Sequence, residues 1–256
     1  MMLRLPAARW IVLLAPPALV LVLWWFLSAA STSVFFPPLS KVLDALVRDL
    51  MNGVLPAAAL FSLGNLFAGL VIATAVGIGF GLLIGETERL RLSLEPLIHF
   101  ARSIPQVALV PLVVGAFGLG AGPKIATIAL AAVWPILLNT IDGVRGVDPS
   151  IRRVSRAYRI PALLHFRRVV LPAAMPQIAA GIRVALPIGV TVMVVSELFA
   201  ANQGLGYYIL HSASKFMLPE TWAGALLVGL IGYALALLFI VVERRALGWY
   251  FRSGAK

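Results

Sequence analysis

Residues 57–85 read AAALFSLGNLFAGLVIATAVGIGFGLLIG, and no charged side chain occurs from Leu50 to Gly85. A hydrocarbon core about 30 Å thick needs about 20 apolar residues in a helix, so this stretch predicts a membrane span. Small residues recur at every fourth position, which places them on one helix face that another backbone can approach closely: Gly69, Ala73, Gly77, Gly81 and Gly85. We interpret this row as close packing within the chain; a subunit interface or a sliding helix is the alternative.

The whole chain has the composition of a membrane protein. Of its 256 residues, 61% are hydrophobic and 12% are charged, and its mean hydropathy is +0.98. Soluble domains are about half apolar and about a quarter charged, so a soluble enzyme, a disordered chain and a disulfide-built module are poor fits. We predict one all-α membrane domain over residues 1–256, with about six spans at residues 10–30, 57–85, 97–117, 123–141, 177–201 and 221–243.

The basic residues predict the orientation of these spans. The chain has 21 Lys and Arg against 10 Asp and Glu, a net charge of +11. With a cytoplasmic N-terminus, 15 basic residues fall inside, two are undecided and four fall outside, namely Lys41, Arg48, Lys124 and Lys215. Because cytoplasmic loops collect Lys and Arg, we predict that both termini are cytoplasmic and that no nucleic acid is bound. We interpret residues 1–34 as holding an uncleaved first helix, although Arg4 and Arg9 before an apolar run also resemble a secretory signal.

Two segments outside the spans have helical patterns. After Pro38, Ser40 is a candidate cap for a short outer helix with an apolar face at positions 42, 43, 46, 47 and 50. The loop 142–175 is predicted to be cytoplasmic, with a helix starting at Asp148, an interruption at Pro161 and a break at Leu171-Pro172. Arginines at positions 152, 153, 156 and 159 alternate with apolar residues in this loop. They predict either a clamp on lipid headgroups or a docking site for a soluble partner.

Polar residues inside predicted spans are candidates for a transport pathway, because placing them in lipid is costly. The candidates for the pathway or its gate are Arg102, Ser103, Pro105, Gln106, Asn139 and Glu197. Pro105 can break the third span beside a cavity. The alternatives are headgroup contact for Arg102, an interhelical hydrogen bond for Asn139, and a structural bond to an arginine or a backbone amide for Glu197. No catalytic motif, phosphate-binding loop or metal-ligand spacing occurs, so we predict neither an enzyme nor a metal site.

Several motifs together resemble those of ABC-importer permeases. Residues 166–181, FRRVVLPAAMPQIAAG, resemble the segment that closes the cytoplasmic coupling loop in that family. Residues 103–112, SIPQVALVPL, together with 197–199 and 204–207, resemble the permeases of sulfonate, taurine and nitrate importers. The resemblance covers about residues 35–245. In the family, the loop begins Glu-Ala-Ala with a Gly six residues after the Glu, whereas the corresponding positions here read Arg153-Val154-Ser155 and Arg159.

This resemblance implies a type I permease in a bacterial inner membrane that imports a small anion such as a sulfonate, taurine or nitrate. Its implied partners are two cytoplasmic ATPases that hold ATP and Mg, a second permease (identical or a paralogue), and a periplasmic or lipid-anchored binding protein docking near 31–55 and 202–219. No cofactor is expected on this chain, and membrane lipid surrounds it. An aromatic acid or a vitamin precursor is the alternative solute, and an ion-driven secondary transporter is the alternative class.

The resemblance also assigns the ATPase contact to the loop. The implied coupling helix runs from about Arg153 to Leu164. Its implied contact residues are Arg153, Val154, Ser155, Arg156, Ala157, Tyr158, Arg159, Ile160 and Pro161.

Overall fold

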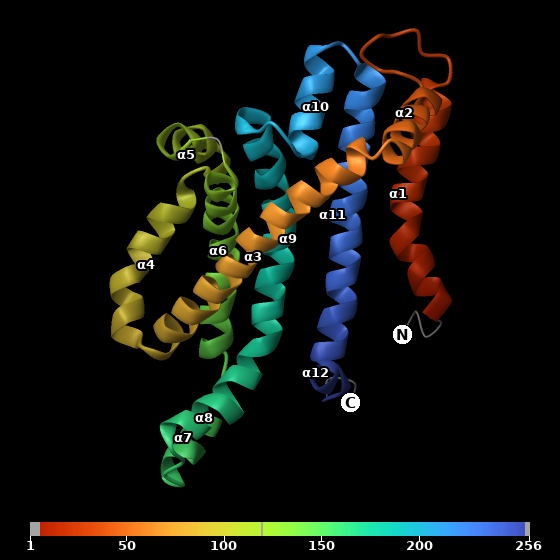
Figure 1. Cartoon of the computed structure of the whole chain (residues 1–256). Coiled ribbons are helices and arrows are strands. Elements are labelled where there is room, and N and C mark those ends of the chain that lie inside the picture. The colour runs from red at the N-terminus through yellow and green to blue at the C-terminus, as the bar shows by residue number, and fades with distance from the viewer. Residues whose placement is uncertain (1–5, 119, 254–256) are drawn as a thin grey trace. The chain divides into compact units, whose positions relative to one another are not determined.

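The computed structural model describes residues 6–118 and 120–253, in which every regular element is a helix (Figure 1). The predicted all-α class is therefore confirmed. The helices are α1 (Pro6–Ser28), α2 (Leu39–Met51), α3 (Val54–Glu86), α4 (Glu88–Ser103), α5 (Val110–Phe117), α6 (Ala121–Arg145), α7 (Pro149–Ala157), α8 (Ala162–His165), α9 (Leu171–Ala200), α10 (Leu205–Ser214), α11 (Leu218–Ala246) and α12 (Gly248–Ser253), with a 3₁₀ turn at Gln106–Leu109 and a π-helical turn at Phe166–Val170.

Four helices of the described residues are long and apolar enough to cross a membrane: Val54–Glu86, Ala121–Arg145, Ala162–Phe199 and Leu218–Ala246. They confirm the spans predicted at 57–85, 123–141, 177–201 and 221–243. In α1 the described apolar part is the shorter helix Ala15–Ser28, so the span at 10–30 stays a prediction.

The third predicted span, 97–117, is not one continuous helix. α4 begins at Glu88, and it meets the segment Gln106–Phe117 at a bend of 74°. Ile104 and Pro105 between them have extended backbone conformations, with ψ of 126° and 106°. Proline has no N–H for the helix ladder and disfavours helical geometry in the residue before it, which explains the break. The predicted effect of Pro105 is confirmed.

The chain divides into two compact units, residues 1–57 with 208–227 and residues 58–207 with 228–256. In the first unit, Ser40 lies inside α2 instead of capping it, because the helix already begins at Leu39 after Pro38. The buried face of α2 consists of Leu39, Val42, Ala45 and Leu46, whereas positions 43, 47 and 50 are exposed. The Tyr208 hydroxyl donates to Asp49 Oδ2 at 2.6 Å, and Arg48 donates to Glu220 Oε1 at 2.6 Å.

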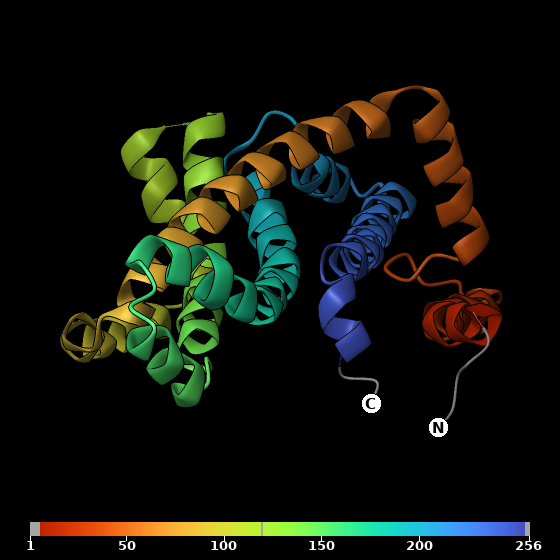
Figure 2. The same cartoon turned by 90° about the horizontal axis from the view of Figure 1, so that it is seen from below.

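In the second unit, α6 packs against α3 and α9, and the small-residue row of α3 faces α6 (Figure 1, Figure 2). A Cβ atom built on Gly69 would lie 2.6 Å from Ile128 Cγ2, and one on Gly85 would lie 2.8 Å from Val144 Cβ. On the other side of α6, a Cβ on Gly181 of α9 would lie 2.8 Å from the Pro135 carbonyl oxygen. The predicted close packing within the chain is therefore confirmed, and the core of this unit lies along α6.

Gly81→Ala tests this packing, because its Cβ would lie 2.5 Å from Thr140 Cβ. Forcing a methyl group into a packed interface costs about 1–3 kcal/mol, so we expect the free energy of unfolding to fall by that amount. Gly79→Ala, two residues earlier with nothing within 4 Å of its Cβ, is the matched control and should not destabilise the chain. Unfolding in detergent measures both, and equal stability of the two variants would contradict the packing.

Candidate functional site

The loop between α6 and α9 begins with a capped helix. The Asp148 carboxylate accepts a hydrogen bond from the Ser150 N–H at 2.7 Å, which confirms the helix start predicted there. This bond stabilises the ionised carboxylate and holds the pKa of Asp148 below its ordinary value. The stabilisation from this cap is fully present above the pKa that Asp148 has in the unfolded chain. It is lost as the pH falls through the pKa that Asp148 has in the folded chain.

The interruption predicted at Pro161 is confirmed, and the implied single coupling helix from Arg153 to Leu164 is wrong. α7 ends at Ala157, a turn follows, and α8 begins at Ala162 after Pro161. Arg159 in this turn has a φ of +50°, the left-handed region that a glycine adopts without strain. It occupies the position where the family pattern has a Gly, the residue that adopts this backbone conformation without strain.

Arg159→Gly should relieve this strain. A residue other than glycine in the left-handed region costs about 1 kcal/mol, so we expect the unfolding free energy of the variant to rise by about that amount. Arg153→Gly, an exposed position inside α7, should lower it by about 1 kcal/mol, because glycine is a poor helix former. Thermal unfolding midpoints compare the two variants, and a change of the same sign in both would contradict the turn.

The predicted coupling residues divide between two sides of this segment. Ser155 is buried, and its hydroxyl lies 2.9 Å from Nδ1 of His165 in α8. Ile160 is half-buried. In contrast, Val154 is 53% exposed and Tyr158 is 79% exposed. We define the α7 face as the exposed members of the set on α7 and in the turn up to Arg159: Arg153, Val154, Arg156, Ala157, Tyr158 and Arg159. Pro161, directly before α8, is also exposed but lies outside this face as defined.

Two residues outside the implied contact set, Arg152 and His165, fix the loop in place. Arg152 donates to the carboxylate of Glu86, the last residue of α3, at 3.0 Å, and to the Val144 carbonyl at 2.7 Å. The Nδ1 atom of His165 forms a hydrogen bond with the Ser155 hydroxyl. Glu86 lies 66 residues from Arg152 in sequence, and no local signal in the chain identifies this pair.

The expected break at Leu171-Pro172 is also wrong. The helix runs without interruption from Ala162 to Phe199, through the π-helical turn at Phe166–Val170 (Figure 1). The missing N–H of Pro172 is tolerated because this residue lies in the first turn of α9, next to the widened π turn. The loop is thus continuous with a span, and Arg183 on that span forms an ion pair with Glu243 of α11.

Polar side chains hold the break after α4. The Gln106 side-chain amide donates to the carbonyls of Ala101 and Ile104 at 3.3 and 3.0 Å, and the Ser103 hydroxyl donates to the His99 carbonyl at 2.7 Å. These bonds satisfy carbonyl groups at the end of the helix. A direct contact of Ser103, Pro105 or Gln106 with a solute stays a prediction.

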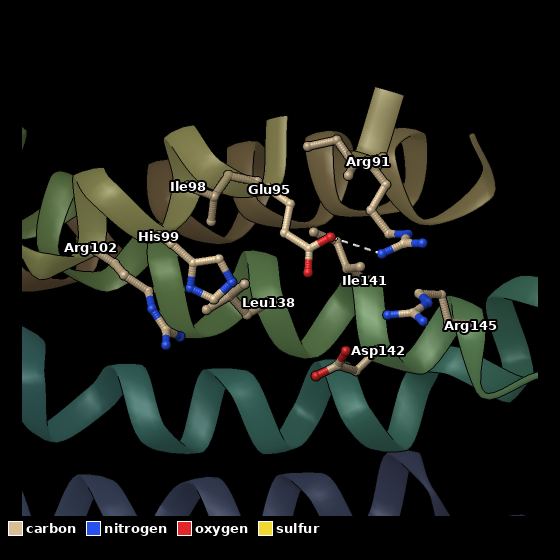
Figure 3. A pocket seen from close by; sticks show the side chains of 10 residues that line it. Arg91, Glu95, Ile98, His99, Arg102, Leu138, Ile141, Asp142 and Arg145 are labelled. Atoms are coloured by element: carbon tan, nitrogen blue, oxygen red, sulfur yellow. Dashed lines mark hydrogen bonds and ion pairs between the residues drawn. The ribbon is translucent and has the colours of Figure 1, made fainter. Parts of the chain in front are cut away.

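Arg102 and Asn139 lie in different surroundings. Arg102 lines a cavity of about 240 Å³ between α4 and α6 (Figure 3). The Asn139 amide donates to the Pro135 carbonyl of its own helix at 2.8 Å, so the structure gives it an intrahelical bond instead of the suggested interhelical one. The two residues therefore do not form one polar site, and their contact with a solute stays a prediction.

Glu197 closes the turn between α9 and α10. Its side chain is 1% exposed, and Oε2 accepts hydrogen bonds from the Ser62 hydroxyl at 2.8 Å and the Gly206 N–H at 2.9 Å. The suggested structural bond to a backbone amide is confirmed. Lys124, which the charge count places on the outer side, lies in the first turn of α6 and is 4% exposed, with Nζ 5.2 Å from the Phe61 ring centroid. The side of the membrane on which it lies stays a prediction.

Comparisons with known proteins agree with this architecture. The family described as "Binding-protein-dependent transport system inner membrane component" matches residues 77–246. A putative aliphatic sulfonates transport permease of Bacillus subtilis is 31% identical over 86% of this chain and 79% of its own length. The taurine transport permease of Escherichia coli is 30% identical over 85% of this chain and 81% of its own length. An inward-facing structure of the MetNI methionine ABC transporter shares the fold, with a TM-score of 0.64 and 17% identity over 77% of this chain and 98% of that chain.

Proposed function

The chain belongs to the family of binding-protein-dependent transport system inner membrane components, and we propose that it moves a small anionic solute inward by alternating access, driven by ATPases that dock on its α7 face. It is the permease subunit of an ABC importer, a transport component and not an enzyme. Its partners include an ATPase and a substrate-binding protein. In the proposed assembly, two ATPases hold ATP and Mg, and a second permease, identical or a paralogue, completes the pathway.

The single observation that carries the proposal is the geometry of the α7 face. Val154 on α7 and Tyr158 directly after it are exposed, and Ser155 fixes the opposite side of the helix. The neighbouring residues 153, 156 and 159 are arginines. Exposed aromatic and arginine residues dominate the binding energy of many protein interfaces. Since Arg153 stands where the family pattern has Glu, we propose that the partner groove carries acidic residues that complement this basic surface.

The same geometry supports a path for the motion. α7 is tied to α3 through Arg152 and Glu86, and α8 continues into the span up to Phe199. That span packs closely against α6 at Gly181, where a Cβ atom would lie 2.8 Å from the Pro135 carbonyl oxygen. A displacement of α7 by an ATPase would therefore reach α3 through the Arg152–Glu86 ion pair and α9 through the short turn before α8.

The solute proposed here is a small anion of the sulfonate class. Two relatives described as sulfonate and taurine permeases support this choice. Few polar side chains within the spans are free to select a solute, because Gln106, Asn139 and Glu197 are bonded within the chain. We propose that selection takes place on the binding protein, which docks near 31–55 and 202–219 on the side opposite the cytoplasmic termini.

Uptake by reconstituted complexes tests the proposal. Vesicles that contain the permease, its ATPase and its binding protein should accumulate taurine or an alkanesulfonate only with ATP, and not with ADP. Omitting the binding protein should lower uptake at low solute concentration by an order of magnitude or more. Uptake driven by an ion gradient in vesicles without ATPase would instead support a secondary transporter and contradict the proposal.

A further inference from the structure

The cavity between α4 and α6 has a charged rim and an apolar floor (Figure 3). Ile84, Ile98, Leu138 and Ile141 form the floor, and three of them belong to a buried cluster. Its volume of about 240 Å³ is below the roughly 300 Å³ at which pockets for drug-sized ligands begin. The cavity is therefore suited to a small polar group with an apolar neighbour.

The charges on the rim are only partly compensated within the chain. Arg91 and Glu95 form an ion pair at 2.9 Å. Among residues 6–118 and 120–253, neither Arg102, Asp142 nor Arg145 has an ion-pair partner within 4.0 Å. All three side chains are exposed and line the cavity, so they are open to a ligand that carries charge of both signs.

Two of the uncompensated charges are close neighbours on one helix. Asp142 and Arg145 are three residues apart in the last turn of α6, which places both on the same face of that helix. Figure 3 shows both labelled beside the cavity, with Arg91 toward the same end and Arg102 toward the other. A carboxylate and a guanidinium that do not pair with each other can bind an ammonium and an oxyanion of one ligand.

This end of the cavity lies at the ends of three helices. Arg145 is the last residue of α6, Arg91 lies near the start of α4, and α3 ends at Glu86. Helix ends lie at the level of lipid headgroups when the helices cross a membrane. On the outside of α4, Leu97 and Phe100 are 60% and 69% exposed, which is the surface expected for contact with acyl chains.

We propose that the cavity binds a phosphoethanolamine group, with its phosphate on the Arg145 guanidinium and its ammonium on the Asp142 carboxylate. The guanidinium fork matches the geometry of a phosphate, and the carboxylate accepts the N–H groups of a primary ammonium. Two sources carry this chemistry. One is the headgroup of phosphatidylethanolamine, whose acyl chains lie along the apolar face of α4, and the other is free phosphoethanolamine.

The lipid source is tested with the full chain in phosphatidylcholine nanodiscs that contain equal amounts of phosphatidylethanolamine and phosphatidylglycerol. Native mass spectrometry of the released protein counts the lipid that each variant keeps. We expect enrichment of phosphatidylethanolamine, about tenfold weaker in Asp142→Asn, where only the ammonium contact is lost. Arg145→Gln should lose phosphatidylethanolamine and phosphatidylglycerol alike, because both carry the phosphate.

Two variants separate a lost contact from a lost fold. Asp142→Glu keeps the carboxylate and should keep the enrichment. Arg89→Gln removes an exposed arginine of α4 that does not line the cavity, and it should also leave the enrichment unchanged.

The soluble source is tested by calorimetric titration of phosphoethanolamine into nanodiscs of phosphatidylcholine alone. Binding that depends on Asp142 and Arg145 supports the site with a soluble ligand, and lipid enrichment without such binding supports it with the lipid. Binding of neither ligand would overturn the proposal. So would an Asp142→Asn variant that retains phosphatidylethanolamine undiminished and phosphatidylglycerol more strongly, since that is the behaviour of a site for anions alone.

Discussion

Gly206→Ala is expected to destabilise the protein by about 3 kcal/mol, at the upper end of the cost of overpacking. A Cβ at this position would overlap the Val194 carbonyl oxygen and lie 2.7 Å from Glu197 Cβ. One neighbour is backbone and the other is the first carbon of a fully buried side chain, so neither can move away by changing a rotamer. The turn from α9 to α10 must open, and Oε2 of Glu197 then loses the Gly206 N–H bond.

The control for this variant is Gly229→Ala in α11, where nothing lies within 4 Å of the added Cβ. We expect it to leave stability unchanged or slightly raised, because alanine is the better helix former. Denaturant unfolding in detergent compares the two variants. A Gly206→Ala protein as stable as the Gly229→Ala protein would show that Glu197 does not hold this turn.

Arg156→Glu and Tyr158→Ala are each expected to separate ATP hydrolysis from transport. Both side chains belong to the α7 face, and Tyr158 is 79% exposed. Loss of one dominant interface residue costs about 2 kcal/mol or more, which weakens binding roughly thirtyfold. We therefore expect less ATPase to co-purify with either variant, and ATP hydrolysis in reconstituted vesicles that solute no longer stimulates.

Arg167→Glu is the matched charge reversal, because Arg167 is exposed in the π-helical turn of the same loop but lies outside the α7 face. Docking predicts that this variant keeps its ATPase. A clamp on lipid headgroups predicts something different: about 1 kcal/mol for each arginine, interchangeably, with little effect of Tyr158. Equal losses in Arg156→Glu and Arg167→Glu, together with a normal Tyr158→Ala, would support the clamp.

The spans could be predicted from the sequence because membrane helices need long stretches without charge, and such stretches are visible in a single chain. The break at Pro105 could also be predicted, since proline affects its own helix. The same rule predicted a helix break at Pro172, and that prediction was wrong. The effect of Pro172 depends on whether a wider turn precedes it, and no residue in Phe166–Val170 announces a π-helical turn.

The buried and exposed sides of the coupling segment could not be predicted, because the resemblance implied one helix from Arg153 to Leu164 and gave no position for the turn before Pro161. The left-handed backbone at Arg159 belongs to this turn, and arginine gives no sign of it. Glu197 depends on a distant partner, because Ser62 lies 135 residues from it in sequence, and Ser155 depends on His165 across the turn between α7 and α8. Contacts of this kind follow from tertiary packing and not from local pattern.

Site-specific labelling tests the central claim, docking on the α7 face, most directly. The chain has no cysteine, so Tyr158→Cys introduces a single thiol at a position that is 79% exposed. A water-soluble maleimide should modify this thiol rapidly in the permease alone and at least tenfold more slowly in the complex with the ATPase. Ser93→Cys, an exposed position on α4, should react equally in both. Protection at position 158 alone is the result that docking predicts, and equal labelling of position 158 with and without bound ATPase would contradict it.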